Sequence, residues 1–166
     1  MSTQEFERKY HLYKDLLYRI SFTYVKNQAD AEDLLQEVFL KLLYQAPVFE
    51  SEEHEKRWLI RVTVNMAKNF VKSIWVRQRD SLENCETLIP WSMDSDKKEL
   101  LREVLDLPDK CKAVMYLHYY EGYTCKEISR MLGLTESAVK MRLKKGRSLL
   151  KMNLLEGGTF YETRRI

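Results

Sequence analysis

The segment TCKEISRMLGLTESAVKMRLKKGRSLLK, residues 124–151, decides the fold expected for this chain. Thr124 and Glu127 form a T-x-x-E capping box, which predicts that a helix starts at Thr124. Gly133 suits the turn that follows, since glycine takes positive φ without strain, and Thr135 is a favourable N-cap for a second helix. Because these signals coincide at the right spacing, we predict a helix-turn-helix.

The second of these helices carries the residues expected to contact DNA. In helix-turn-helix proteins this helix enters the major groove, where its side chains contact base edges. The residues that we expect to face bases are Glu136, Ser137, Lys140, Met141 and Lys144. Those better placed for phosphates or for the flank of the helix are Arg142, Lys145 and Arg147. A solvated basic face is the alternative for the same lysines and arginines.

The composition of the whole chain favours an all-α protein. Glycine (5) and proline (3) are scarce among the 166 residues, whereas good helix formers are plentiful. A further helix is predicted from Pro108 to about Tyr120. Residues 77–98 are polar and lack helical periodicity, which predicts a flexible linker. We therefore expect two small helical domains, at 1–76 and 99–152, followed by a tail at 153–166.

Several classes of function find no support in the sequence. The three cysteines contain no CxxC pair, and the histidines do not fall at zinc-ligand spacing. No nucleophile elbow or phosphate-binding glycine loop is present, so we expect no enzyme activity, no metal and no cofactor. No apolar run reaches the roughly 20 residues that span a bilayer, and the polar N-terminus does not resemble a signal peptide. We expect a cytoplasmic protein that is not inserted in a membrane.

The segment DAEDLLQEVFLKLL, residues 30–43, predicts an amphipathic helix with an acidic side. Residues that fall within one arc of about 100° are Ala31, Leu34, Leu35, Val38 and Leu42. Residues on the polar side include Asp33, Gln36 and Glu37, with Leu40 among them. An apolar anchor with a charged rim is typical of a protein interface, and the acids require a basic partner. A solvated helix with one exposed leucine is the alternative.

The segment RWLIRVTVNMAKNFVKS, residues 57–73, predicts a helix with a basic side. Its apolar side is formed by Leu59, Ile60, Val64, Met66, Ala67, Phe70 and Val71. The residues expected to contact DNA on the opposite side are Trp58, Arg61, Asn65, Lys68, Asn69 and Lys72. Cations bind phosphates, amides contact base edges and an indole stacks on an unpaired base, so this side suits locally melted DNA. For Trp58, a partly buried core position is the alternative.

In this order, the three segments resemble an RNA polymerase sigma factor of the small, two-domain extracytoplasmic-function (ECF) group. Residues 30–43 resemble the region 2 helix that binds the clamp helices of the polymerase β′ subunit in that family. Residues 58–71 resemble the adjacent segment that recognises and melts the −10 promoter element. Residues 107–150 are similar to region 4, which binds the −35 element. The resemblance implies an alternative sigma factor that binds core RNA polymerase and directs promoter-specific transcription initiation.

The resemblance also implies roles for individual residues. The positions that match core-polymerase contacts are Asp33, Gln36 and Glu37, and Leu40 joins them by its place on the helix. Those that match −10 contacts are Asn65, Lys68, Asn69 and Lys72, with a base-selecting loop expected near Ser73–Arg79. Those that match −35 contacts are Lys140, Met141, Lys144 and Lys145. Many relatives carry Arg at 140 and 145 and a small polar residue at 141. An anti-sigma protein is an implied further partner.

Two other interpretations remain open. The chain could be an ordinary helix-turn-helix repressor or activator whose first domain dimerises or binds a ligand. Such a protein would bind a symmetric operator without core polymerase. Alternatively, it could be an adaptor that keeps the sigma shape but has no promoter activity, in which case replacing Lys140 and Lys144 would change nothing.

Overall fold

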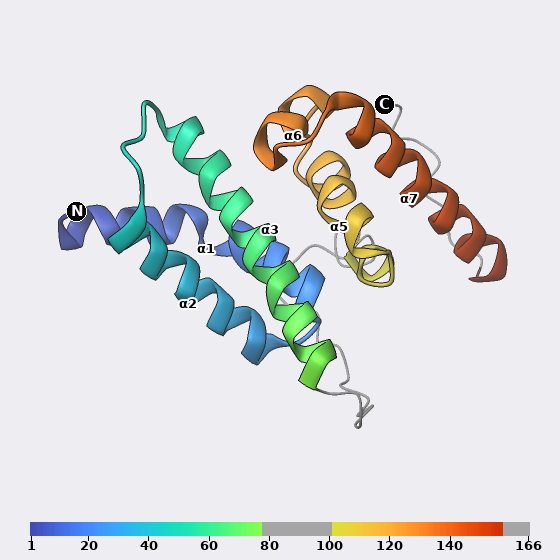
Figure 1. Cartoon of the computed structure of the whole chain (residues 1–166), viewed down its shortest axis with the longest axis horizontal. Coiled ribbons are helices and arrows are strands. Elements are labelled where there is room, and N and C mark those ends of the chain that lie inside the picture. Colours follow the sequence, from blue (N-terminus) through green and yellow to red (C-terminus); the bar gives the residue numbers. More distant parts are fainter. Residues whose placement is uncertain (78–100, 158–166) are drawn as a thin grey trace. The chain divides into compact units, whose positions relative to one another are not determined.

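In the computed structural model of the chain, residues 1–77 and 101–157 are described, and they form helices and turns without any strand. The chain divides into two compact units, Met1–Ile89 and Pro90–Ile166 (Figure 1). The predicted all-α class with two small helical domains is therefore confirmed. Of the predicted linker at 77–98, all but its first residue lies outside the described residues. No helix in the described ranges has both the length and the apolarity that crossing a bilayer requires.

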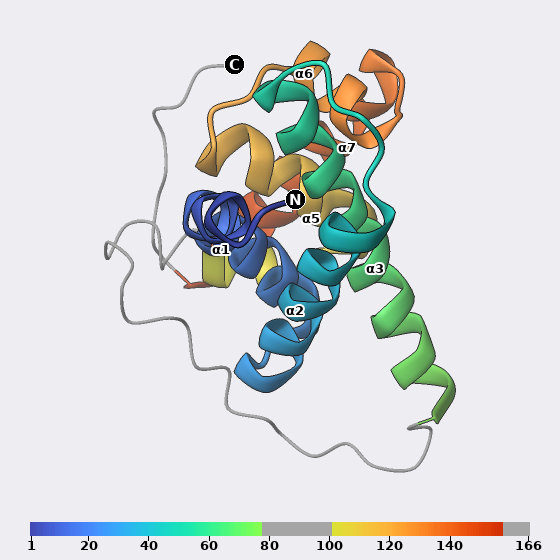
Figure 2. The same ribbon diagram turned by 90° about the vertical axis from the view of Figure 1, so that its left-hand side faces the viewer.

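Within residues 1–77 of the first unit, three helices pack on one another (Figures 1 and 2). These are α1 (Thr3–Val25), α2 (Gln28–Gln45) and α3 (Glu52–Arg77). Lys26 ends α1 in the left-handed conformation, with φ of 62°. Asn27 then caps α2, because its Oδ1 accepts a hydrogen bond from the Asp30 amide at 2.8 Å. This short connection turns the chain back, so that α1 and α2 lie side by side.

The apolar arc predicted for α2 faces the core of this unit. The residues of that arc, all of which are buried, are Ala31, Leu34, Leu35, Val38 and Leu42. Phe39 is also buried, which the arc did not predict. Its ring lies 4.9 Å from the ring of Tyr10 and 6.0 Å from that of Phe6, both on α1. Contacts with a neighbouring helix therefore widen the buried stripe of α2 beyond the predicted arc.

A buried ion pair joins α1 to the first turn of α3. The ammonium group of Lys9 binds the carboxylate of Glu55, and both residues are almost inaccessible to solvent. Burial alone would lower the pKa of Lys9, but the contacts with Glu55 and Glu5 together outweigh it and raise that pKa. The Tyr13 hydroxyl also hydrogen-bonds Glu55, and burial together with this carboxylate raises the pKa of Tyr13. These contacts fix where α3 begins relative to α1.

The second unit contains the predicted helix-turn-helix. Residues 101–105 are helical and are followed by α5 (Asp109–Met115), a π-helical turn η1 (Tyr116–Tyr120), α6 (Cys125–Leu132) and α7 (Glu136–Gly157). The helix predicted from Pro108 to about Tyr120 is present. It begins after Pro108, which is its N-cap, and its last turn is π-helical. Helix α7 continues to Gly157, so the beginning of the predicted tail at 153–166 is helical.

Candidate functional site

The outer side of α2 carries an exposed set of residues that we call the acidic surface: Asp33, Gln36, Glu37 and Leu40. All of them are exposed, and Leu40 keeps 53% of its surface accessible. They recur at helical spacing on the side opposite to the buried arc of α2, so one partner surface can contact all of them. The structure therefore brings together every residue that the sequence assigned to this surface.

Three exposed apolar residues continue from Leu40, and the sequence analysis missed them. Leu43 and Tyr44 follow Leu40 by three and four positions, so they adjoin it along α2. Val48 follows in the connection to α3, and both it and Tyr44 are more exposed than Leu40. The helical spacing from Leu40 was the available signal. The apolar part of this side of α2 is consequently larger than one leucine.

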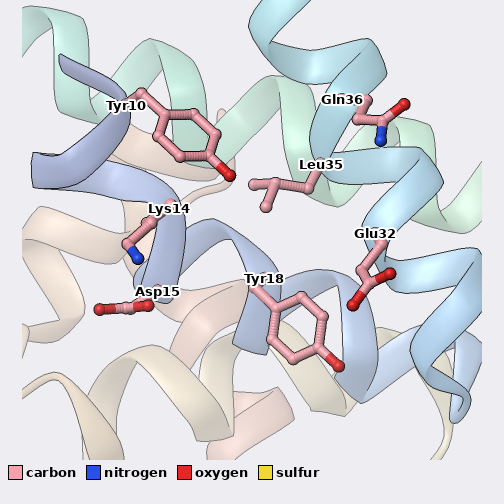
Figure 3. Close-up of a pocket in the computed structure, with 7 residues that line it drawn as sticks. All are labelled: Tyr10, Lys14, Asp15, Tyr18, Glu32, Leu35 and Gln36. Atoms are coloured by element: carbon pink, nitrogen blue, oxygen red, sulfur yellow. The ribbon is translucent and has the colours of Figure 1, made fainter. Parts of the chain in front are cut away.

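A shallow pocket of about 260 Å³ lies between α1 and α2, beside the acidic surface (Figure 3). The residues that line it are Tyr10, Lys14, Asp15, Tyr18, Glu32, Leu35 and Gln36. Leu35 projects from α2 toward α1, with Tyr10 and Tyr18 on the α1 side. Burial, and secondarily the carboxylate of Glu32, raises the pKa of Tyr18. Because Gln36 belongs to both, the pocket and the acidic surface are continuous.

Helix α3 carries a second set of residues, which we call the basic face: Trp58, Arg61, Asn65, Lys68, Asn69 and Lys72. Members of this set recur every three or four residues and therefore follow one side of the helix. Arg61, Asn65, Asn69 and Lys72 are exposed, whereas Lys68 and Trp58 are half-buried. The opposite side packs on the core through Leu59, Ile60, Val64 and Ala67, with Met66, Phe70 and Val71 half-buried.

Trp58 packs against the protein but is not fully buried. Its indole lies 5.5 Å from the ring of Phe49 in an edge arrangement, so one side of it is packed. The residue is nevertheless only half-buried, which leaves part of the ring accessible. The Phe49 ring in turn lies 6.0 Å from the ammonium group of Lys9. The buried ion pair of α1 and α3 thus adjoins the aromatic residues that hold Trp58.

The prediction of a loop near Ser73–Arg79 is wrong for the first residues of that range. Residues 73–77 continue α3, and the remainder lies outside the described residues. No glycine or proline occurs between residues 57 and 77, so nothing in this stretch interrupts the helical hydrogen bonds. Helix α3 is therefore longer than expected.

The helix-turn-helix is built by the predicted caps. The Thr124 hydroxyl accepts from the Glu127 amide at 3.2 Å, and the Glu127 carboxylate accepts from the Thr124 amide at 2.8 Å. Gly133 ends α6 with φ of 66°, a conformation that costs glycine no strain. The Thr135 hydroxyl then accepts from the Ala138 amide at 3.1 Å and caps α7. All of these predictions are confirmed.

Helix α7 separates its residues into a packed and an exposed side. Val139, Leu143 and Gly146 are buried, and a Cβ atom on Gly146 would lie 2.7 Å from Sδ of Met115 on α5. The predicted DNA contacts that are exposed are Ser137, Lys140, Met141, Lys144 and Lys145. Glu136 is exposed as well, at the first position of the helix.

Arg142 and Arg147 lie on the flank of α7 and not on its exposed side. Both are half-buried, and Arg147 donates to the Tyr119 hydroxyl at 3.4 Å. Burial raises the pKa of the Cys111 thiol, against the opposing effect of Lys145 and Arg142. Lys145 and Arg142 are therefore near enough to Cys111 of α5 to affect its thiol.

The charged and apolar groups of these surfaces are suited to binding. Within the described ranges, no three His, Cys, Asp or Glu side chains are grouped so that they could hold a metal ion. The acidic surface suits a basic protein, while the basic face and α7 carry cations and amides suited to nucleic acid. Surfaces of opposite charge on separate helices can engage a protein and DNA at the same time.

Comparisons with known proteins agree with this division. The family model described as sigma-70 region 2 matches residues 10–77, and the model described as sigma-70, region 4 matches residues 97–150. The RNA polymerase sigma factor SigV of Bacillus subtilis is 33% identical over 144 residues, 86% of each chain. The ECF RNA polymerase sigma factor SigX of the same species is 30% identical over 164 residues, 91% of this chain and 84% of that protein.

A solved structure supports the fold. It is the co-crystal structure of the sigma factor RpoE in complex with the anti-sigma factor NepR from Bartonella quintana. This chain matches it with a TM-score of 0.73 and 18% identity, over 95% of this chain and 100% of that one. The two family models, the two relatives and this structure together match both helical units. The chain therefore belongs to the sigma-70 family, as an ECF-type alternative sigma factor that directs promoter-specific transcription initiation.

Proposed function

We propose that this sigma factor docks on the β′ clamp helices of core RNA polymerase through its acidic surface. The proposal is carried by one observation, the exposure of Leu40 at 53% beside three polar residues of the same helix side. An exposed leucine within a carboxylate rim gains apolar burial when a basic partner covers it. Burying the exposed half of a leucine side chain is worth about 1 kcal/mol, which is about fivefold in affinity.

The basic face of α3 captures melted −10 DNA in this proposal. Arg61 and Lys72 are exposed for phosphates, and the amides of Asn65 and Asn69 are exposed for base edges. The accessible part of the Trp58 ring can stack on an unpaired base, while Phe49 keeps its orientation. Binding only the unpaired bases shifts the equilibrium between closed and open DNA toward the open state.

Helix α7 binds the −35 duplex in the major groove. Its exposed Ser137, Lys140 and Lys144 follow one another at helical spacing, as contacts along a groove require. Lysine is a point charge and lacks the planar fork with which arginine binds guanine through two hydrogen bonds. Lys140 and Lys144 therefore contribute more to affinity than to the choice of base.

The protein then acts as a specificity subunit of the cytoplasmic polymerase and has no catalytic activity of its own. Domains at 1–76 and 99–152 engage the two promoter elements, and the segment at 77–98 connects them. Each module is small, so tight promoter binding depends on their joint engagement within the holoenzyme. By analogy with the RpoE–NepR complex, we propose an anti-sigma protein as a further partner that covers these surfaces.

The test is a measurement of core-polymerase affinity for two charge-reversal variants. Glu37→Lys reverses a charge within the acidic surface, and Glu7→Lys makes the same change at an exposed position of α1. We expect Glu37→Lys to lose binding to core polymerase while its circular dichroism stays unchanged, and Glu7→Lys to bind normally. Equal binding by both variants would contradict the proposed docking surface.

Glu37→Lys, together with alanine variants of α7, also separates the two rival interpretations. A helix-turn-helix repressor or activator would bind a symmetric operator alone, and Glu37→Lys would not affect it. An adaptor without promoter activity would bind core polymerase, but Lys140→Ala and Lys144→Ala would leave transcription unchanged. A sigma factor requires both surfaces, so each of these changes lowers promoter-specific transcription.

A further inference from the structure

One residue on the exposed side of α7 differs in chemistry from its neighbours. Met141 keeps 71% of its surface accessible, although its side chain is apolar. Lys140 precedes it, Ser137 lies one turn before it, and Lys144 and Lys145 lie one turn after it, all of them exposed. From Glu136 to Ser148, the exposed side of this helix is therefore polar or charged except at Met141.

Packing within the protein does not account for this methionine. Val139, Leu143 and Gly146 form the packed side of α7, and Met141 lies two positions from both Val139 and Leu143. Two positions correspond to a rotation of about 200° around a helix, so Met141 points away from the packed side. An exposed thioether side chain gains stability only when a partner covers it.

The major groove offers one apolar group on the base edges, the 5-methyl group of thymine. The other groups that distinguish base pairs there are hydrogen-bond donors and acceptors, which a thioether matches poorly, and the C5–H of cytosine, which offers less apolar surface than a methyl group. Methionine is long and unbranched, so it can reach the groove floor and adapt to a methyl group. The lysines on either side of it can hold the helix against the phosphates while this contact forms.

We infer that Met141 is a specificity-determining residue that contacts the 5-methyl group of a thymine in the −35 element. This inference rests on the proposed binding of the −35 duplex by α7 and names the base feature that this helix selects. Because cytosine has a hydrogen in place of that methyl group, the contact favours thymine over cytosine at the same position.

Uracil substitution tests this contact without changing base pairing. In a promoter that the holoenzyme transcribes, each thymine of the −35 element, on either strand, is replaced by uracil in turn, which removes only the methyl group. We expect one replacement to weaken promoter binding by the wild-type holoenzyme about fourfold, the value of one buried methyl-sized group. The holoenzyme with Met141→Ala should bind both DNAs equally, at the weaker affinity.

Two further variants control for general effects. Met141→Leu keeps an apolar side chain of similar size and should retain most of the sensitivity to uracil. Leu12→Ala removes another apolar side chain that is exposed at 53%, on α1, and should leave the sensitivity unchanged. Alanine is a strong helix former, so neither alanine variant should unfold its helix.

The outcomes distinguish this inference from the function on which it rests. If no uracil replacement affects the wild-type holoenzyme but Lys144→Ala weakens promoter binding, the methyl contact is refuted and −35 binding by α7 stands. If a uracil effect persists undiminished in Met141→Ala, another residue makes the contact and the inference is also refuted. If Lys144→Ala and Met141→Ala both leave promoter binding unchanged, the proposed −35 interface itself is wrong.

Discussion

Removing Lys9 should destabilise the first unit more than removing its partner Glu55. In Lys9→Met the carboxylate of Glu55, which is only 4% exposed, keeps the Tyr13 hydroxyl but loses its cation. Breaking a buried ion pair from one side costs about 3–5 kcal/mol. We expect the lower end, about 3 kcal/mol, because the Tyr13 hydroxyl still donates to the carboxylate. In Glu55→Gln the Lys9 ammonium keeps Glu5 at 3.4 Å, so this variant should lose less.

The double variant Lys9→Met with Glu55→Met provides the decisive comparison. It removes both charges and fills the site with apolar side chains, which is often neutral or stabilising relative to a buried ion pair. Its loss of stability should therefore be smaller than that of Lys9→Met alone. The matched control is Arg8→Ala, which breaks the exposed pair between Arg8 and Glu52 at the same crossing of helices. Water screens that pair, so this control should stay close to wild type.

Urea unfolding of the full chain measures these differences. Trp58 reports on the first unit once Trp75 and Trp91 are replaced by phenylalanine. The midpoint should fall most for Lys9→Met, less for Glu55→Gln and least for Arg8→Ala, with an unchanged slope. Equal midpoints for Lys9→Met and Arg8→Ala would refute the view that this pair holds α1 to α3. So would a double variant whose loss equals the sum of the losses measured for Lys9→Met alone and Glu55→Met alone.

Three further predictions concern the second unit. Gly146→Leu should destabilise the second unit by about 1–3 kcal/mol in thermal unfolding, because any Cβ at this position meets the buried Met115. An unchanged melting temperature would contradict the close packing of α5 and α7. Thr124→Ala should cost about 1 kcal/mol in the same experiment through loss of the capping box, whereas Thr124→Ser should retain the stability. In a background with Cys85→Ser and Cys125→Ser, Cys111 should react with a thiol reagent at neutral pH only when the protein unfolds, because its raised pKa and its burial keep it a protected thiol. Rapid labelling of Cys111 in the folded chain would contradict this.

Local signals in the sequence predicted much of the fold. The capping box at Thr124, the left-handed turn at Gly133 and the cap at Thr135 depend on residues within one or two turns of each other. The apolar arc of α2 was predictable for the same reason, because it follows from helical periodicity alone. These features occur in the structure where the sequence placed them.

Features that depend on distant residues were not predictable. Lys9 is buried because Glu55, 46 positions away, meets it across two helices, and no periodicity indicates such a pair. Phe39 is buried because Phe6 and Tyr10 of α1 cover it. The π-helical turn at residues 116–120 also carried no signal that we recognised. Helical spacing from Leu40 could have indicated Leu43 and Tyr44, but the exposure of Val48, which lies beyond the end of α2, required the structure.

Transcription in vitro tests the central claim most directly. Core RNA polymerase transcribes genomic fragments with no added factor, with this protein, or with its Glu37→Lys variant. We predict transcripts that begin at a few defined sites only when the wild-type protein is present, and that disappear with the variant. Active core polymerase that produces no new starts with the folded wild-type protein would contradict the proposed function.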